Sequence, residues 1–150
     1  MEVEQNGKTE IVPIDYKLYH PEWKTIIRPD ILKRADNKCE CCGVENKLVI
    51  ERGFWGDIEA YQDCIKDCGA IYRADNSEYI TSDYLGSLDK ATDKMIAIVL
   101  TIAHLDHDIS NNDYSNLKAM CQRCHNRYDM PNRVKNRKKN VTNPDQISLF

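Results

Sequence analysis

The sequence has no apolar run long enough to cross a membrane. Its longest apolar stretch, Met95–Ala103, falls well short of the roughly 18 residues that a spanning helix needs, and Thr101 interrupts it. The first seven residues, Met-Glu-Val-Glu-Gln-Asn-Gly, are acidic and polar, unlike a secretory signal. We therefore expect a cytoplasmic protein with no membrane partner.

The sequence also lacks internal repeats, and its composition is ordinary. The 150 residues are 41% hydrophobic and 30% charged, which is typical of a globular domain. A chain of this length is expected to form one domain whose core is modest and benefits from an additional cross-link.

Cysteines are the exception to this ordinary composition. Seven is an odd number, and without a secretory signal metal binding is a better explanation than a disulfide framework. Two Cys-x-x-Cys pairs can supply four thiolates to one tetrahedral Zn²⁺. The sequence therefore predicts a structural zinc that closes a loop of about 80 residues, with four ligands: Cys39, Cys42, Cys121 and Cys124.

The other three cysteines carry a weaker signal. Cys41 lies between two predicted ligands and is expected to be a bystander, or to exchange with Cys42. Cys64 and Cys68 are spaced for one turn of a helix. Two ordinary core residues are the simpler interpretation, because a second metal site would need further ligands.

The first half of the chain predicts a helix, a turn and a strand. Apolar residues at four-residue spacing indicate a helix, which Pro29 should kink or restart: Trp23, Ile27, Ile31 and Ala35. Gly43 suits a tight turn after the first cysteine pair. Residues 47–52 are expected to form a short strand. Residues 53–94 have poor periodicity and are predicted to be an insertion, with a short helix around Ile58–Ile65.

The second half is patterned more clearly. Met95–Ala103 is rich in β-formers and predicts one continuous strand, buried on both faces. Residues 106–115 are rich in Asp, Asn and Ser and predict a loop. A short strand or turn is expected over residues 116–120. Gln122–Asp129 should then be helical and end before Pro131.

Charge is distributed unevenly. Residues 1–117 carry 13 Lys and Arg against 22 Asp and Glu, whereas residues 118–150 carry 8 against 2. A basic segment beside a candidate site favours contact with phosphates, although a solvated basic tail is the simpler alternative. The predicted nucleic-acid contacts are Arg123, Arg127, Arg133, Lys135, Arg137, Lys138 and Lys139.

The order of motifs resembles the HNH endonuclease family. A strand ends in His104, a polar loop leads to Asn116-Leu117, and a Cys-x-x-Cys pair is followed at once by His125. The upstream Cys-x-x-Cys-Gly matches the zinc-bearing subset of that family. The resemblance covers roughly residues 21–52 and 95–130. It implies an α+β fold with a ββα-metal, treble-clef-like finger, an N-terminal helix and a structural four-cysteine zinc site. The expected organisation is a nuclease domain over residues 1–139, with a flexible tail over 140–150.

The resemblance also implies a mechanism, the metal-dependent hydrolysis of phosphodiester bonds in DNA. By position, His104 would be the general base that activates water, since histidine changes protonation near neutral pH. Asn116 would tie down the loop so that His104 is oriented. His125 would bind a catalytic Mg²⁺ or another divalent cation, which stabilises charge on the phosphate.

One position departs from the family pattern. Many members have Asp or His just before the base as a second metal ligand, whereas this chain has Ala103. A hard cation prefers oxygen, which favours Asp106, or else Asp108, over His107 as a replacement. Alternatively, His125 and water alone hold the cation, or activity is weakened. In the last case the chain would be a zinc module that binds nucleic acid or a replication protein.

The last five residues resemble the pentapeptide by which bacterial replication and repair proteins bind the sliding clamp. They follow a polar segment, 140–145, that is expected to be a flexible linker. In this interpretation Leu149 and Phe150 fill an apolar pocket of the clamp and Gln146 bonds at its rim. The alternative is that the apolar residues of the tail fold back onto their own domain.

Overall fold

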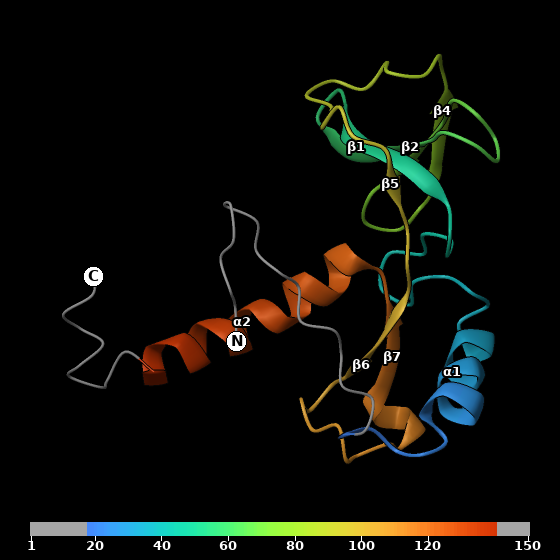
Figure 1. Ribbon diagram of the computed structural model, residues 1–150. Helices are drawn as coiled ribbons and strands as arrows, with labels where there is room; N and C mark the ends of the chain where they lie inside the picture. Colours follow the sequence, from blue (N-terminus) through green and yellow to red (C-terminus); the bar gives the residue numbers. More distant parts are fainter. Residues whose placement is uncertain (1–17, 141–150) are drawn as a thin grey trace, which may run out of the picture.

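A computed structural model of the chain describes residues 18–140, and for residues 138–140 it describes the backbone only. The described chain is α+β, with two separate antiparallel sheets. In Figure 1 the larger sheet lies at one end, the small sheet and helix α1 lie at the other, and helix α2 projects sideways from between them. Among the described helices, none combines the length and apolar character needed to cross a membrane.

The predicted N-terminal helix is present, and Pro29 restarts it. A π-helical turn, η2 (Trp23–Ile27), is followed directly by α1 (Arg28–Arg34), with the proline in the first turn of α1. Proline is tolerated there because the first turn leaves its N–H groups without helical partners anyway. The buried face packs against the small sheet, and it consists of Trp23, Ile27 and Ile31.

Residues 49–97 form a five-stranded sheet, and most of it comes from the segment 53–94 whose poor periodicity gave no clear secondary structure. Its strands run in the order β4-β3-β2-β1-β5. Their bounds are β1 (Val49–Trp55), β2 (Ile58–Asp63), β3 (Ala70–Arg73), β4 (Tyr79–Ser82) and β5 (Ile96–Ala97).

The predicted helix around Ile58–Ile65 is wrong because its residues form strand β2. The last four residues of β2 are all buried, so the strand lacks the alternation of a half-exposed one. Gly56 has a φ of +61° and lets the chain reverse tightly between β1 and β2. A short run buried on both faces does not reveal its period, and the sequence therefore could not separate strand from helix here.

A buried amide ties the irregular part of this region to the sheet. The side chain of Gln62 is 1% exposed, and its Nε2 donates to the carbonyls of Gly69 at 3.1 Å and Tyr84 at 3.0 Å. Its Oε1 accepts from the backbone N–H of Gly86 at 3.2 Å. Three loop groups are thus satisfied by one side chain, which explains how a segment without regular structure is held in place.

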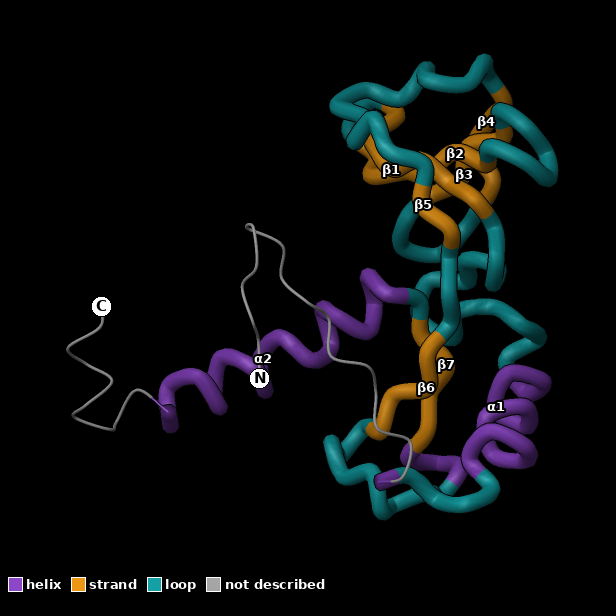
Figure 2. The backbone as a smooth tube through the Cα atoms, in the orientation of Figure 1, coloured by secondary structure: helices purple, strands orange, loops and turns teal. Residues whose placement is uncertain are grey.

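The predicted strand over Met95–Ala103 is divided between the two sheets. After β5 the chain leaves the large sheet, and β6 (Thr101–His104) pairs with β7 (Leu117–Met120) in the small one. Figure 2 shows this continuous passage from β5 to β6. The expectation of burial on both faces is wrong, because Met95 and Val99 are 64% and 50% exposed.

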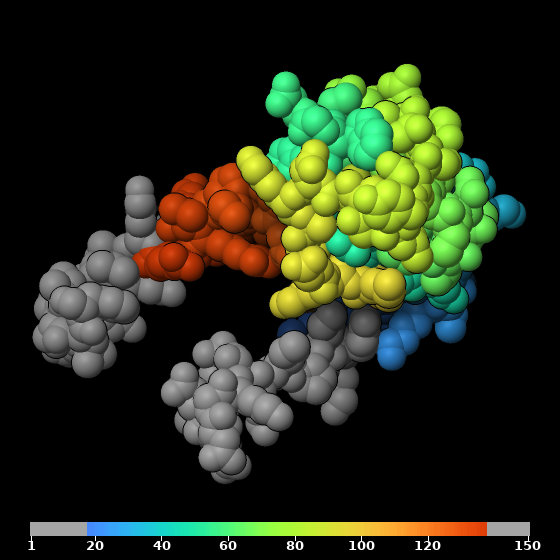
Figure 3. Space-filling model, turned by 90° about the horizontal axis from the view of Figure 1, so that it is seen from above, coloured from blue at the N-terminus to red at the C-terminus, as the bar shows by residue number. Residues whose placement is uncertain are grey.

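The second half ends in a helix longer than predicted. A short 3₁₀ turn, η3 (Tyr114–Asn116), precedes β7, and α2 (Gln122–Asn140) then continues through Pro131. A proline inside a helix removes the hydrogen bond to the carbonyl four residues earlier, here that of Arg127. Both residues are exposed, so water can satisfy that carbonyl. Figure 3 shows α2 standing out from the body of the described chain.

We predict that Ile31→Ala lowers the free energy of unfolding by about 2–4 kcal/mol, because it leaves a cavity under α1. Ile31 is 0% exposed, whereas Ile26 in the preceding turn is 45% exposed. Ile26→Ala is the matched control, with an expected change of less than about 0.5 kcal/mol. Urea denaturation of the zinc-loaded protein measures both, and equal effects would contradict the packing of α1 on the small sheet.

Candidate functional site

The four predicted zinc ligands lie together. The sulfur atoms of Cys39, Cys42, Cys121 and Cys124 are all within 4.8 Å of one another. Among the described residues, they are the only group of three or more such side chains gathered this closely. The sulfurs of Cys42 and Cys121 are 3.8 Å apart. A tetrahedron with Zn–S bonds of about 2.3 Å has an edge of about 3.8 Å, so the cluster is positioned to bind a metal ion such as zinc.

A tight turn presents the first two sulfurs. The N–H of Gly43 donates to the carbonyl of Cys39 at 2.8 Å, and the N–H of Cys42 approaches the Cys39 sulfur at 3.5 Å. Gly43 has a φ of +80°, which a residue with a side chain rarely adopts. A Cβ there would also meet the Asn76 carbonyl oxygen at 3.3 Å. The predicted role of Gly43 in this turn is confirmed.

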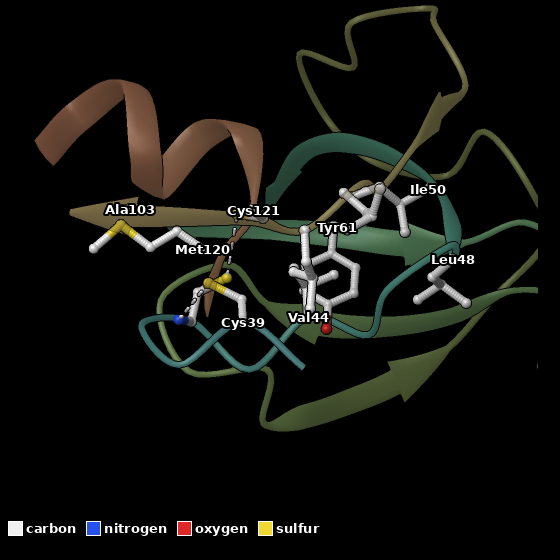
Figure 4. Close-up of a cluster of buried hydrophobic side chains, with 11 residues drawn as sticks. Cys39, Val44, Leu48, Ile50, Tyr61, Ala103, Met120 and Cys121 are labelled. Carbon is white, nitrogen blue, oxygen red and sulfur yellow. Dashed lines mark hydrogen bonds between the residues drawn. The ribbon is translucent and has the colours of Figure 1, made fainter. Parts of the chain in front are cut away.

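The end of β7 and the start of α2 present the other two sulfurs. The N–H of His125 donates to the Cys121 carbonyl at 2.9 Å, as expected in a first helical turn. Glu40 joins the two halves, since its backbone N–H donates to the Ala119 carbonyl at 2.9 Å and its Oε1 accepts from the Ala119 N–H at 3.1 Å. Figure 4 shows Cys39 and Cys121 side by side at the edge of the buried cluster.

The crowded sulfurs favour a bound cation. Hydrogen bonds from the thiols of Cys121, then of Cys124 and Cys42, lower the pKa of Cys39. Hydrogen bonding to its three neighbouring cysteines raises the pKa of Cys124, with Cys121 contributing most. Arg52 brings positive charge close: burial lowers the pKa of its guanidinium, while Cys121, Cys42 and Cys124 raise it. Four thiolates with one guanidinium nearby would carry a net charge of −3, and a divalent cation would reduce it to −1.

The remaining cysteines, Cys41, Cys64 and Cys68, are not members of this cluster. None of the seven cysteines forms a disulfide, and Cys41 and Cys68 are exposed. The segment from Cys64 to Cys68 is a bend and not the helical turn that the spacing suggested. The buried carboxylate of Asp63 shapes it by accepting from the backbone N–H groups of residues 65, 66 and 67 at 2.8–3.0 Å.

Beside the small sheet lies a cavity of about 340 Å³ that gathers the candidate catalytic side chains. It combines three of the four histidines of the chain with one carboxylate. The lining residues are Tyr19, Ile102, His104, His107, Ile109, His125, Asp129, Asn132 and Arg133. The structure therefore brings together His104 and His125, which the sequence placed in one site.

His104 ends strand β6 and is 8% exposed. The Trp23 ring stacks on its imidazole at 5.0 Å between centroids, with 20° between planes. Its Nε2 lies 3.0 Å from the Asn112 Oδ1, an acceptor, so this nitrogen carries the proton. The His104 Nδ1 makes no hydrogen bond with the described residues, and no fully buried side-chain nitrogen or oxygen among them lacks a partner. Nδ1 is therefore not fully buried, and its lone pair remains accessible.

His125 lies in the first turn of α2 and is anchored by β6. Its Nδ1 is 2.6 Å from the Thr101 Oγ1, and that hydroxyl donates to the Met120 carbonyl at 3.3 Å. Since a hydroxyl has one hydrogen, the ring donates to Oγ1 through Nδ1. The other ring nitrogen, Nε2, then presents a lone pair 3.2 Å from the Asp129 Oδ2. Two lone pairs facing each other require a proton or a cation to hold them.

His107 and Asp129 complete the group, and sequence analysis did not select either. The His107 Nδ1 is 3.6 Å from the other Asp129 oxygen, Oδ1. His107 has a left-handed φ of +61°, and its ring stacks on Tyr128 at 5.5 Å. The spacing of four residues between His125 and Asp129 was the signal for the carboxylate, because such side chains share a helix face. No sequence signal marks the backbone conformation of His107.

The structure directs Asp106 into the loop and not toward the cavity. Its carboxylate accepts from Asn111 Nδ2 at 2.7 Å, from the Asp108 N–H at 2.9 Å and from Asn116 Nδ2 at 2.9 Å. These bonds lower the pKa of Asp106 to about 2, with Asn111 contributing most. Asp106 is absent from the residues that line the cavity. The expected pairing of Asp106 with His125 is therefore not formed, because the loop uses this carboxylate internally.

Asn116 lies where a loop anchor is expected. Its Nδ2 donates to the Asn111 carbonyl at 2.9 Å, and its Oδ1 accepts from the Asp106 N–H at 3.1 Å. Its backbone carbonyl accepts from the Leu105 N–H at 2.8 Å. Asn116 thus closes the loop next to His104, while Asn112 and Trp23 make the direct contacts with the imidazole.

The basic residues of α2 have different surroundings. The Arg123 side chain is 16% exposed and pairs with Glu59 of β2, and Arg127 lies 3.7 Å from the same carboxylate. Arg133 lines the cavity, 3.9 Å from Asp129. Lys135 and Arg137 are exposed. The side chains of Lys138 and Lys139, and the tail residues Gln146, Leu149 and Phe150, lie outside what the structure describes.

Comparison with protein-family models, curated proteins and solved structures gives no significant match for this chain. What the structure defines is an α+β protein with a four-cysteine site positioned for a metal ion such as zinc.

We predict one Zn²⁺ per chain by elemental analysis. Cys39→Ser or Cys121→Ser should release it and unfold or aggregate the protein, because the binding energy of a structural zinc is folding energy. Cys41→Ser is the matched control in the same turn, since Cys41 is exposed and outside the cluster. Zinc absent from protein with intact thiols, or equal loss in the Cys41 variant, would refute the assignment.

Proposed function

We propose that this protein is a metal-dependent endonuclease of the HNH type that hydrolyses phosphodiester bonds in DNA. The observation that carries the proposal is the cavity, where an accessible imidazole nitrogen of His104 and the His125–Asp129 pair line the same space. The four-cysteine zinc centre positions the start of α2, which carries His125 and Asp129, and the β6–β7 hairpin carries His104. Preorganised groups on a rigid frame are what hydrolysis of a stable phosphodiester requires.

In this proposal the chain supplies a general base on one side of the cavity and ligands for a divalent cation on the other. His104 takes a proton from water through Nδ1, and the resulting hydroxide attacks phosphorus while the bond to the leaving sugar oxygen breaks. The leaving oxygen then takes a proton from solvent. Asn112 keeps the proton on Nε2, so that Nδ1 stays the base. His125 and Asp129 would hold a divalent cation, which would neutralise the charge that develops on the phosphate.

Helix α2 offers the charge that DNA binding needs. Arg133 lies at the cavity, and Arg127, Lys135 and Arg137 are exposed along the same helix. Lys and Arg neutralise backbone phosphates without reading sequence. Arg123 pairs with Glu59 and so links α2 to the large sheet, and its contact with DNA stays a prediction.

The second candidate function is a zinc module that binds nucleic acid or a replication protein without cutting. Ala103 favours it, because this position gives the cation no ligand. The two candidates share a scaffold, and only the chemistry at His104 separates them.

We predict that zinc-loaded protein nicks plasmid DNA with added Mn²⁺ or Mg²⁺ and not with EDTA. His104→Ala should lower the rate by at least about 100-fold, because a positioned base contributes about 10²–10⁴. His20→Ala is the matched control, since His20 is exposed and lies outside the cavity. Full activity in His104→Ala, or binding of DNA without any cleavage by wild-type protein, would overturn the nuclease proposal.

The C-terminal tail carries a separate proposal, binding of the bacterial sliding clamp. It rests on the sequence Gln146-Ile147-Ser148-Leu149-Phe150. We predict that deleting residues 146–150 abolishes clamp binding, measured by calorimetry in the micromolar range, and leaves DNA nicking unchanged. A deletion that destabilises the fold, or full-length protein that fails to bind at tens of micromolar, would show that the tail is structural.

A further inference from the structure

We propose that His107 joins His125 and Asp129 in a site of two histidines and one carboxylate that selects a transition-metal cation such as Mn²⁺ over Mg²⁺. The inference rests on the proposed function in that it assigns the catalytic cation to this cavity. In this site the imidazole of His107, three residues after the base His104, takes the place that the sequence-based prediction gave to Asp106.

The first support is the central position of Asp129. Its two oxygens face one ring nitrogen each, His125 Nε2 at 3.2 Å and His107 Nδ1 at 3.6 Å. All three side chains line the same cavity. Ligand atoms around one metal lie about 3 Å apart, given bonds of about 2.0–2.2 Å. The two distances between the carboxylate and the imidazoles are near this value, and the proposal requires the rings of His107 and His125 to rotate toward a common point beside Asp129.

The second support is the proton arrangement. Thr101 holds the proton of His125 on Nδ1, which leaves a lone pair on Nε2 toward the cavity. A backbone or hydroxyl partner on one nitrogen that frees the other is the usual way in which a protein prepares a metal-binding histidine. The nearest cationic side chain paired with Asp129 is that of Arg133, at 3.9 Å, which is too long for a strong hydrogen bond.

The third support is the way the loop presents His107. Its backbone N–H donates to the His104 carbonyl at 3.0 Å, and its φ of +61° is a conformation that non-glycine residues seldom adopt. The Tyr128 ring stacks on the imidazole, and the Tyr128 hydroxyl donates to the Leu105 carbonyl. Six other described non-glycine residues share this backbone conformation, so the support comes from the stacking and hydrogen bonding that fix the imidazole at the cavity.

The carboxylates of Asp106 and Asp108 accept hydrogen bonds within the loop. Asp106 accepts from Asn111 and Asn116, and Asp108 accepts from the hydroxyl and the N–H of Ser110 at 2.6 and 2.9 Å. Neither lines the cavity. Apart from His104, which is proposed as the base, the available donor set in the cavity is two imidazole nitrogens and one carboxylate. Imidazole suits Co²⁺, Ni²⁺ and Zn²⁺, and among the oxygen-preferring cations Mn²⁺ accepts an imidazole nitrogen more readily than Mg²⁺, which retains its water.

Mn²⁺ binding to the full-length, zinc-loaded protein tests this without DNA or turnover. Electron paramagnetic resonance measures free Mn²⁺ in a titration and gives the Kd. We expect one site whose Kd rises at least about tenfold in His107→Ala and in Asp129→Asn, because loss of a supporting or direct ligand weakens metal binding by about 10–100-fold. Asp108→Ala is the matched loop control, with an unchanged Kd, and Mg²⁺ at equal concentration should not displace Mn²⁺. Zinc content, measured in parallel, verifies that each variant stays folded.

Several results would overturn the inference: no Mn²⁺ bound by wild type, the same Kd in His107→Ala, or equal competition by Mg²⁺. DNA cleavage that persists alongside an unchanged Kd in His107→Ala would remove this inference and leave the proposed function intact. Mn²⁺ binding that requires His107, in a protein that cuts no DNA, would remove the proposed function and leave the metal site intact.

Discussion

The contact between the sulfurs of Cys42 and Cys121, 79 residues apart along the chain, is the constraint on which the rest of the structure depends. One cysteine pair closes a turn before the large sheet, and the other spans the junction of β7 and α2. A cation held there would fix the junction of β7 and α2 to the turn that carries Cys39 and Cys42. His125 directly follows the last of these cysteines, so the same centre would also set the position of one wall of the cavity.

The other wall comes from a different part of the chain. Trp23, from the helical turn η2, stacks on His104, while β6 carries both His104 and the Thr101 that anchors His125. The large sheet does not line the cavity, but its Glu59 forms an ion pair with Arg123 near the start of α2. Three separate regions thus hold the proposed catalytic groups, and the loop after His104 contributes His107.

Sequence analysis identified the elements whose chemistry is local. The spacing of Cys39, Cys42, Cys121 and Cys124 predicted their assembly, and the polar composition of residues 106–115 predicted a loop. The sequence-based predictions were wrong where contacts between distant parts of the chain determine the local structure. Strand β2 is buried on both faces and has no visible period, and Pro131 is accommodated because α2 is exposed there. His107 reaches the cavity through one left-handed residue, which composition does not encode, whereas Asp129 was detectable from its spacing to His125.

A crystal structure of the His104→Ala variant with a short DNA duplex and Mn²⁺ tests the central claim most directly, because the variant should bind the substrate without cutting it. The expected result is a backbone phosphate in the cavity between position 104 and His125, with the strand running along the exposed basic side chains of α2. A duplex bound on another face, with no phosphate at the cavity, would contradict the assignment of this pocket to phosphodiester hydrolysis.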